Sequence, residues 1–99
     1  MIVNTQSIKF KADQKLLDFI QARLDKLDQY YEQVLNADVY LKVEKASDRE
    51  NKIVEVRLNV PGNDLVAVKD AKTFEQATDL VTEALRRKLR KHKEKVKGI

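Results

Sequence analysis

The sequence predicts an α+β two-layer sandwich of order β-α-β-β-β-α, in which a four-stranded mixed sheet carries two helices on one face. Two observations lead to this prediction. Apolar residues recur at helical spacing in two long segments, around residues 13–33 and 74–97. Between them, apolar residues occupy every second position, which is typical of strands with one buried face. Because each strand offers a single apolar face, both helices are expected to cover that face.

The first two predicted elements are a strand over residues 2–11 and a helix over residues 13–33. The strand segment is short, β-branched and mixed in polarity. Asp13 is a suitable N-cap for the helix. Behind it, apolar side chains recur at Leu16, Leu17, Ile20, Leu24, Leu27 and Tyr31. Of Tyr30 and Tyr31, one is expected to close the core and the other to form a half-exposed cap, with nucleotide stacking as the alternative.

Three further strands are predicted between the helices. Residues 37–45 and 53–60 alternate, and a polar loop over residues 46–52 joins them. Their expected inward residues are Ala37, Val39, Leu41, Val43, Val54, Val56, Leu58 and Val60. Pro61 and Gly62 suit the two central positions of a type II turn, and a short strand over residues 65–69 follows. The first two strands should be parallel with a right-handed crossover, and the remainder an antiparallel meander.

The second helix begins with a capping box formed by Thr73 and Gln76. Its apolar stripe comprises Phe74, Ala77, Val81, Leu85, Leu89, His92 and Val96. About 24 residues would span about 36 Å, and the stripe thins toward the end, so the basic end should extend beyond the sheet. The sheet face opposite the helices is expected to be open to water or a partner, with Tyr40, Lys42, Glu44, Glu55 and Arg57.

Positive charge is concentrated in the last helix. Residues 86–97 contain eight Lys and Arg and one acid, a local charge of +7, whereas the remaining residues sum to −3. Like charges three and four positions apart each cost an isolated helix roughly 0.2–0.5 kcal/mol, and a single glutamate cannot offset them all. A basic helix on a mildly acidic body therefore favours a polyanionic partner, with a solvated helix face as the alternative.

Composition excludes several classes of function. The 99 residues fit one domain, and no apolar run is long enough to cross a membrane. Without cysteine there are no disulfides or thiolate metal sites, which fits a cytoplasmic protein. One histidine forms no zinc cluster, and no glycine-rich loop is present to hold a nucleotide. We therefore expect no catalysis, cofactor, metal, small-molecule substrate or membrane partner.

Individual candidates have two interpretations each. His92 either packs beside Leu89 and Val96 or contacts RNA. Arg23 and Lys26 either balance nearby aspartates, which include Asp18, Asp25 and Asp28, or join the basic helix in binding if they line up with it. Lys42, on the open sheet face, is either solvated or part of an interface.

Two segments carry a family resemblance. DKLDQYYEQVLNADVYLKVEK (residues 25–45) and LRRKLRKHKEKVK (residues 85–97) resemble the bacterial ribosome hibernation promoting factors and the related ribosome-associated inhibitor, once called sigma-54 modulation proteins. The resemblance covers essentially the whole chain. Longer members add a C-terminal dimerisation domain, and nothing follows Ile99, so residues 1–99 are expected to form a single ribosome-binding domain of the short form.

The resemblance implies binding to the small ribosomal subunit, against ribosomal RNA, in the channel between head and body. There the protein would block messenger and transfer RNA and preserve inactive ribosomes in starvation or stationary phase, in some bacteria with other hibernation factors. By position it implies RNA contacts at Lys26, Lys42, Lys45, Arg87, Lys91, His92, Lys93 and Lys95. Arg86, Lys88 and Arg90 are expected to strengthen the same face, and Arg23 is a further candidate beside Lys26.

Two positions depart from the pattern of many relatives. Thr73 replaces an acidic N-cap and Glu75 stands where tyrosine is common, so the resemblance carries no tyrosine contact to this position.

Two rival functions remain on the residues alone. A general double-stranded-RNA-binding module shares helices on one face of a small sheet. A membrane-surface or protein-docking helix would need Trp or Phe near its end, and none follows Phe74.

Overall fold

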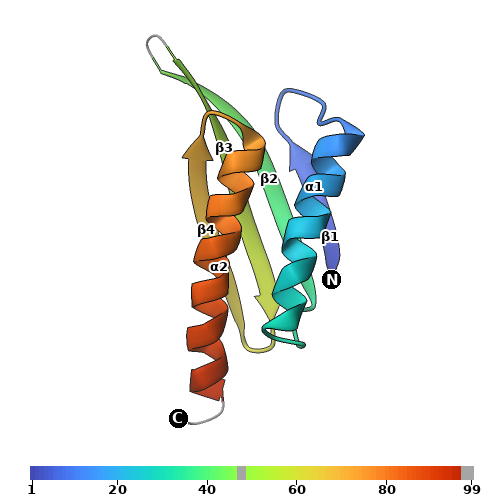
Figure 1. Cartoon of the computed structure of the whole chain (residues 1–99), viewed down its shortest axis with the longest axis vertical. Helices are drawn as coiled ribbons and strands as arrows, with labels where there is room; N and C mark the ends of the chain where they lie inside the picture. Colours follow the sequence, from blue (N-terminus) through green and yellow to red (C-terminus); the bar gives the residue numbers. More distant parts are fainter. Residues whose placement is uncertain (47–48, 97–99) are drawn as a thin grey trace.

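The predicted α+β sandwich and its element order are confirmed. The computed structural model describes the backbone of residues 1–46 and 49–96 and the side chains of residues 1–45 and 51–95. The elements are β1 (Ile2–Ser7), α1 (Gln14–Asp25), the 3-10 helix η1 (Lys26–Gln29), β2 (Asn36–Ala46), β3 (Arg49–Val60), β4 (Asn63–Ala71) and α2 (Phe74–Val96). Both helices lie side by side on one face of the sheet (Figure 1).

The sheet has the order β1-β2-β3-β4. β1 pairs in parallel with β2, in a register that sets Thr5 opposite Val39. β2 and β3 are antiparallel, with Val39 opposite Val56, and β4 continues the meander with Ala67 opposite Val56. This is the predicted pairing. The parallel pair needs a crossover between its strands, and α1 with η1 supplies it.

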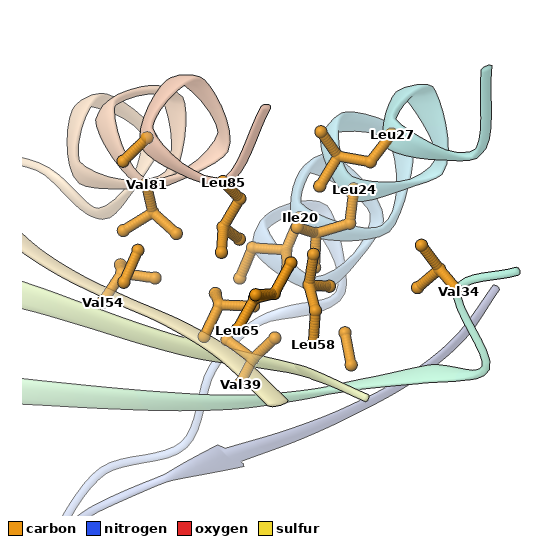
Figure 2. Packing of buried hydrophobic residues seen from close by; sticks show 14 of the residues in the cluster. Ile20, Leu24, Leu27, Val34, Val39, Val54, Leu58, Leu65, Val81 and Leu85 are labelled. Atoms are coloured by element: carbon orange, nitrogen blue, oxygen red, sulfur yellow. The ribbon is translucent and has the colours of Figure 1, made fainter. Parts of the chain in front are cut away.

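One hydrophobic core lies between the sheet and the helix layer. The alternating residues predicted to face inward, from Ala37 to Leu41 in β2 and from Val54 to Val60 in β3, are buried. They meet Ile20 and Leu24 of α1 and Leu85 of α2, whose side chains point toward the sheet (Figure 2). Burying one face of each strand under both helices explains why the opposite sheet face stays polar.

The predicted caps and the tight turn are also confirmed. Oδ1 of Asp13 accepts a hydrogen bond from the Leu16 amide at 2.9 Å and caps α1. Oγ1 of Thr73 accepts one from the Gln76 amide at 3.1 Å at the start of α2. Gly62 has φ = +82°, the left-handed conformation that the third residue of a type II turn requires. These local contacts fix where each helix begins and where β3 reverses into β4.

The prediction placed the ends of the first strand and the first helix too late. β1 ends at Ser7, and Lys9 follows with φ = +67°, which turns the chain toward α1. α1 ends at Asp25 and continues only as η1. The chain must leave the helix layer here to reach β2. Tyr31 and Val34 are buried although they lie outside any α-helix. The helical spacing of Tyr31 therefore led to a prediction that extended the helix too far.

The hairpin between β2 and β3 is longer than predicted. Backbone pairing continues to Ala46 and Arg49, so most of the predicted loop over residues 46–52 is strand, and residues 47–48 lie outside the described residues. This hairpin extends beyond the helices (Figure 1). Val43, predicted to lie in the core, is therefore 38% exposed. β4 is also longer than the predicted residues 65–69, because β3 pairs with it over its whole length.

Burial predicts unequal costs for two leucine truncations in α2. Leu85→Ala should lower the free energy of unfolding by about 2–5 kcal/mol, because Leu85 is fully buried and its removal leaves a cavity. Leu80, on the same helix, is 49% exposed, and Leu80→Ala should change stability by no more than about 0.5 kcal/mol. Urea denaturation followed by circular dichroism measures both. Equal losses in the two variants would contradict the packing described above.

Candidate nucleic-acid interface

The buried stripe of α2 determines where its cations lie. Val81, Leu85 and Leu89 are fully buried, and His92 is 9% exposed. With 3.6 residues per turn, this stripe leaves the lysines and arginines only the flanks and the outer surface of the helix. They form two rows that follow helical spacing. The η1-side row comprises Arg86, Arg90 and Lys93, and the β4-side row comprises Lys88, Lys91 and Lys95.

The η1-side row is held against the end of η1. The Arg86 guanidinium lies over the Tyr30 ring, 5.7 Å from its centroid. Nζ of Lys93 donates to the Tyr30 carbonyl oxygen at 3.4 Å. Arg86 also donates to Glu83 through Nη2 at 2.5 Å and through Nε at 3.3 Å, and this hydrogen bonding lowers the pKa of Glu83 and raises the pKa of Arg86. The charge of Arg86 is therefore already balanced in part by an acid on its own helix.

The β4-side row borders an open pocket at the edge of the sheet. Its three lysines and His92 form one wall, and residues 63–66 at the start of β4 form the other, around a volume of about 350 Å³. Arg87 lies between the two rows and lines a neighbouring hollow with Ala84, Lys88 and Lys91. Arg86 and Arg90 therefore do not share a flank with Lys91 and Lys95, contrary to the expectation of a single basic face.

His92 packs into the core rather than projecting with the cations. Its ring meets the ring of Tyr31 edge to face, with centroids 5.4 Å apart, and both residues are buried. His92 is therefore packed, but its observed neighbour is Tyr31, which lies in the core while Tyr30 remains 45% exposed. The RNA contact of His92 stays a prediction. Within the described part of the chain, Nε2 of His92 is buried without a hydrogen-bond partner. Leaving such an atom unpaired costs a fold about 1–3 kcal/mol in lost hydration.

Arg23 connects the two helices instead of joining either row. Its Nε donates to Oδ1 of Asp79 at 2.7 Å, and its guanidinium lies 4.6 Å from the centroid of the Phe19 ring. Asp79 precedes Arg86 by about two helical turns, so this contact lies nearer the start of α2 than the basic rows do. Lys26 begins η1 and is exposed.

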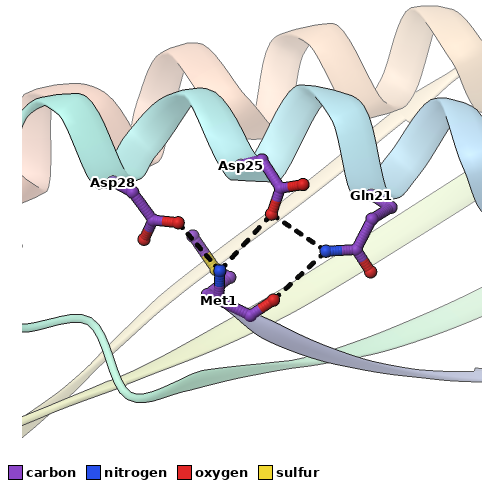
Figure 3. A network of polar contacts seen from close by, with 4 residues as sticks. All are labelled: Met1, Gln21, Asp25 and Asp28. Atoms are coloured by element: carbon purple, nitrogen blue, oxygen red, sulfur yellow. Dashed lines mark hydrogen bonds and ion pairs between the residues drawn. The ribbon is translucent and has the colours of Figure 1, made fainter.

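The aspartates expected to balance Arg23 and Lys26 have other partners. The Met1 amino group donates to Asp28 at 2.8 Å and to Asp25 at 3.4 Å, which raises the pKa of that amine (Figure 3). The Gln21 amide donates to Asp25 at 2.9 Å and to the Met1 carbonyl oxygen at 3.2 Å. This network attaches the start of β1 to α1 and η1.

Lys42 and Lys45 are not brought together with the basic rows. Nζ of Lys42 lies 3.9 Å from a carboxylate oxygen of Glu55, on the sheet face that the helices do not cover. Lys45 is three residues further along β2, so its side chain is on the other face of the strand from Lys42, in the β2–β3 hairpin. That hairpin and the basic end of α2 are at opposite ends of the molecule (Figure 1). The predicted RNA-binding residues therefore occupy several separate regions rather than one surface.

Sequence reasoning missed the residues that complete these surroundings. Residues 63–66 form half of the pocket, and Asp79 and Glu83 bind two of the candidate arginines. The Pro61–Gly62 turn marked the start of β4, but no local signal shows which turn of α2 lies beside it. In the part of the chain that the structure describes, no group of three potential metal-binding side chains occurs. No described helix combines the length and apolarity needed to cross a membrane.

Comparison with known proteins identifies relatives along the whole chain. The family model described as sigma 54 modulation protein / S30EA ribosomal protein matches residues 3–97. A ribosome hibernation promoting factor of Pseudomonas putida is 30% identical over 99 residues, which cover 100% of this chain and 93% of that protein. Another, from Escherichia coli K12, is 30% identical over 97 residues and covers 98% of each chain.

A solved structure has a similar fold. The structure of a ribosomal subunit interface protein from Coxiella burnetii superposes with a TM-score of 0.84 at 18% identity, and covers 94% of this chain and 98% of that one. At this identity the structural likeness supports the fold alone.

The Arg23–Asp79 contact predicts a measurable coupling between α1 and α2. A double-mutant cycle of Arg23→Ala and Asp79→Ala should give about 0.2–1 kcal/mol, because both side chains are partly exposed to water. The cycle cancels the separate contact of Arg23 with Phe19. The coupling should shrink in 1 M NaCl, where the screening length is about 3 Å. A cycle of Lys26→Ala with Asp79→Ala is the control and should give no coupling, and equal values in the two cycles would contradict the assignment.

Proposed function

Because this chain belongs to the sigma 54 modulation protein / S30EA ribosomal protein family, we propose that it inactivates ribosomes by occupying the messenger and transfer RNA channel of the small subunit. The family relationship supports a role in ribosome hibernation, and the protein is not an enzyme. In this proposal it acts in the cytoplasm by steric occlusion, and it preserves inactive ribosomes during starvation or stationary phase.

The observation that supports the proposal best is the presence of cations on both flanks of the last turns of α2. A flat polyanionic surface can approach only one flank of a helix at a time. Two rows, separated by the width of the helix, instead match two phosphate backbones with the helix between them. Such contacts position a protein on RNA without reading its sequence. Selectivity for the ribosome would then come from the shape of the channel.

Occlusion also requires a body that RNA cannot displace or deform. Leu85 and Leu89 fix α2 to the sheet, and Tyr31 with His92 extends the packing toward its basic end. The molecule measures 48 × 26 × 18 Å, so its long axis brings the basic end of α2 to one extremity. A rigid, elongated body with the basic rows of α2 at one end is suited to insertion into a channel lined by RNA.

Charge reversal at two lysines should remove ribosome binding without unfolding the protein. Lys91→Glu with Lys93→Glu changes one cation in each row, and both side chains are exposed. The phosphates would then face two carboxylates, so co-sedimentation with purified small subunits should be lost. Thermal stability should change by no more than about 1 kcal/mol, as is usual for surface substitutions.

The matched control is Lys11→Glu with Lys15→Glu, which changes the net charge equally at exposed positions away from the basic end of α2. The control should still co-sediment, and messenger RNA with initiator transfer RNA should displace it. Unchanged binding of the Lys91/Lys93 variant would remove the basic helix from the mechanism. Equal affinity of the parent protein for free duplex RNA would instead favour a general double-stranded-RNA-binding module.

Salt dependence should distinguish contacts on both flanks from contacts on one. We expect alanine substitution of either row to weaken binding to small subunits and to reduce the dependence of the affinity on salt. Each lost phosphate contact should reduce the slope of log affinity against log salt by roughly 0.7–0.9. Substitution of the η1-side row should reduce this slope less, because Glu83 already neutralises part of the charge of Arg86. If substitution of one row changed neither the affinity nor its salt slope, measured across a salt series, the model of two phosphate backbones would be contradicted.

A further inference from the structure

We propose that the pocket between α2 and the edge of β4 binds one unpaired ribonucleotide, with its phosphate on the β4-side lysines and its base against β4 and His92. The inference rests on the proposed function, because it specifies how RNA is held, and it adds a defined subsite to a general electrostatic surface. The pocket has a volume of about 350 Å³, within the range of small-molecule sites in proteins.

The phosphate would lie against the helix. Lys88, Lys91 and Lys95 follow one another at spacings of three and four residues and line the same wall. Lysine ammonium groups bind phosphate as point charges with rotatable donors. On the opposite wall, Asp64 brings one negative charge. The two walls therefore differ in charge, and a phosphate would be favoured only on the side of the helix.

The base would lie against the strand. Leu65 and Val66 border the pocket and provide apolar surface beside His92, against which the flat face of an unpaired base would pack. Among the described strands, β4 pairs only with β3 and so forms an edge of the sheet. The backbone N–H and C=O groups along that edge can bond to the polar edge of a base. In a duplex those base edges are already paired, so an unpaired nucleotide is the better occupant.

His92 supplies a second and independent indication of a ligand. It is nine-tenths buried, and within the described residues its Nε2 has no hydrogen-bond partner. His92 lines this pocket and an adjoining hollow bordered by Gly62, Asn63 and Lys95. A neutral imidazole nitrogen either donates or accepts a hydrogen bond, so a ribonucleotide could satisfy it through a phosphate oxygen, a hydroxyl or a base. Solvated lysines alone would not produce this feature.

The chain offers a matched pair of substitutions that change the charge of the pocket without touching the lysines. Oδ1 of Asn63 accepts a hydrogen bond from the Asp64 amide at 2.8 Å. Asn63→Asp keeps an oxygen at that position and adds a negative charge, whereas Asp64→Asn removes one. The first should weaken nucleotide binding and the second strengthen it, each by roughly two- to fivefold in water. Asp70→Asn, at the other end of β4, is the control and should have no effect.

The test is an NMR titration of the ¹⁵N-labelled full chain with ribonucleoside 5′-monophosphates, and separately with inorganic phosphate. We expect nucleotides to shift the amide signals of residues 63–66 and 88–95 and to bind more tightly than phosphate. Equal affinities, or shifts that cover both rows of α2 without involving β4, would overturn the nucleotide assignment. The assignment would also be overturned if Asn63→Asp did not weaken nucleotide binding and Asp64→Asn did not strengthen it.

Two further arms separate the source of the nucleotide and the fate of the proposed function. A single-stranded oligoribonucleotide that competes with the monophosphate, when a duplex of the same sequence does not, would support capture from RNA. Competition by the duplex as strong as that by the single strand would contradict it. If small subunits co-sediment with the protein but nucleotides leave residues 63–66 unperturbed, the pocket inference fails and the proposed function stands. If nucleotides bind the pocket but subunits do not co-sediment, the pocket stands without that function.

Discussion

The structure depends on one constraint, which is that its sheet has a single apolar face that must be removed from water. Strands bury alternate residues, so Val39, Val56 and Ala67 face the helices while their neighbours face solvent. Each fully buried aliphatic side chain contributes roughly 1.5–3 kcal/mol. Both helices therefore lie in one layer on that face, and this arrangement decides the position of every other feature, including the basic rows and the pocket beside them.

The same constraint explains how α2 carries so many cations. Like-charged neighbours cost a helix roughly 0.2–0.5 kcal/mol per pair, while burial of Leu85 and Leu89 contributes several times more. Packing of the apolar stripe also fixes the rotation of the helix about its axis. That rotation sends Arg86 toward η1 and Lys91 toward β4. A helix held only by its own hydrogen bonds would have no reason to present two separate rows.

Ion pairing separates the cations into those paired with acids of the protein and those that border the pocket. Arg23 is paired with Asp79 across the two helices, and Arg86 is paired with Glu83 within α2, so both charges are partly balanced before any partner binds. The lysines of the β4-side row instead border an open pocket, where a polyanion can reach them. Because the excess of positive charge lies in residues 86–97, at one extremity of an elongated body, the field of the protein would also steer that end toward RNA.

The sequence by itself determined the element order, the buried faces of β2 and β3 within the layer that the helices cover, the caps at Asp13 and Thr73 and the basic character of α2, because these follow from local periodicity and short-range hydrogen bonds. Tertiary structure alone decided the rest. The helix predicted through residue 33 stops at Asp25, since the chain must cross to β2, and Val43 is exposed because the hairpin outruns the helices. The partners of Arg23 and His92, and the meeting of residues 63–66 with α2, depend on contacts between residues distant in sequence, which no local pattern encodes.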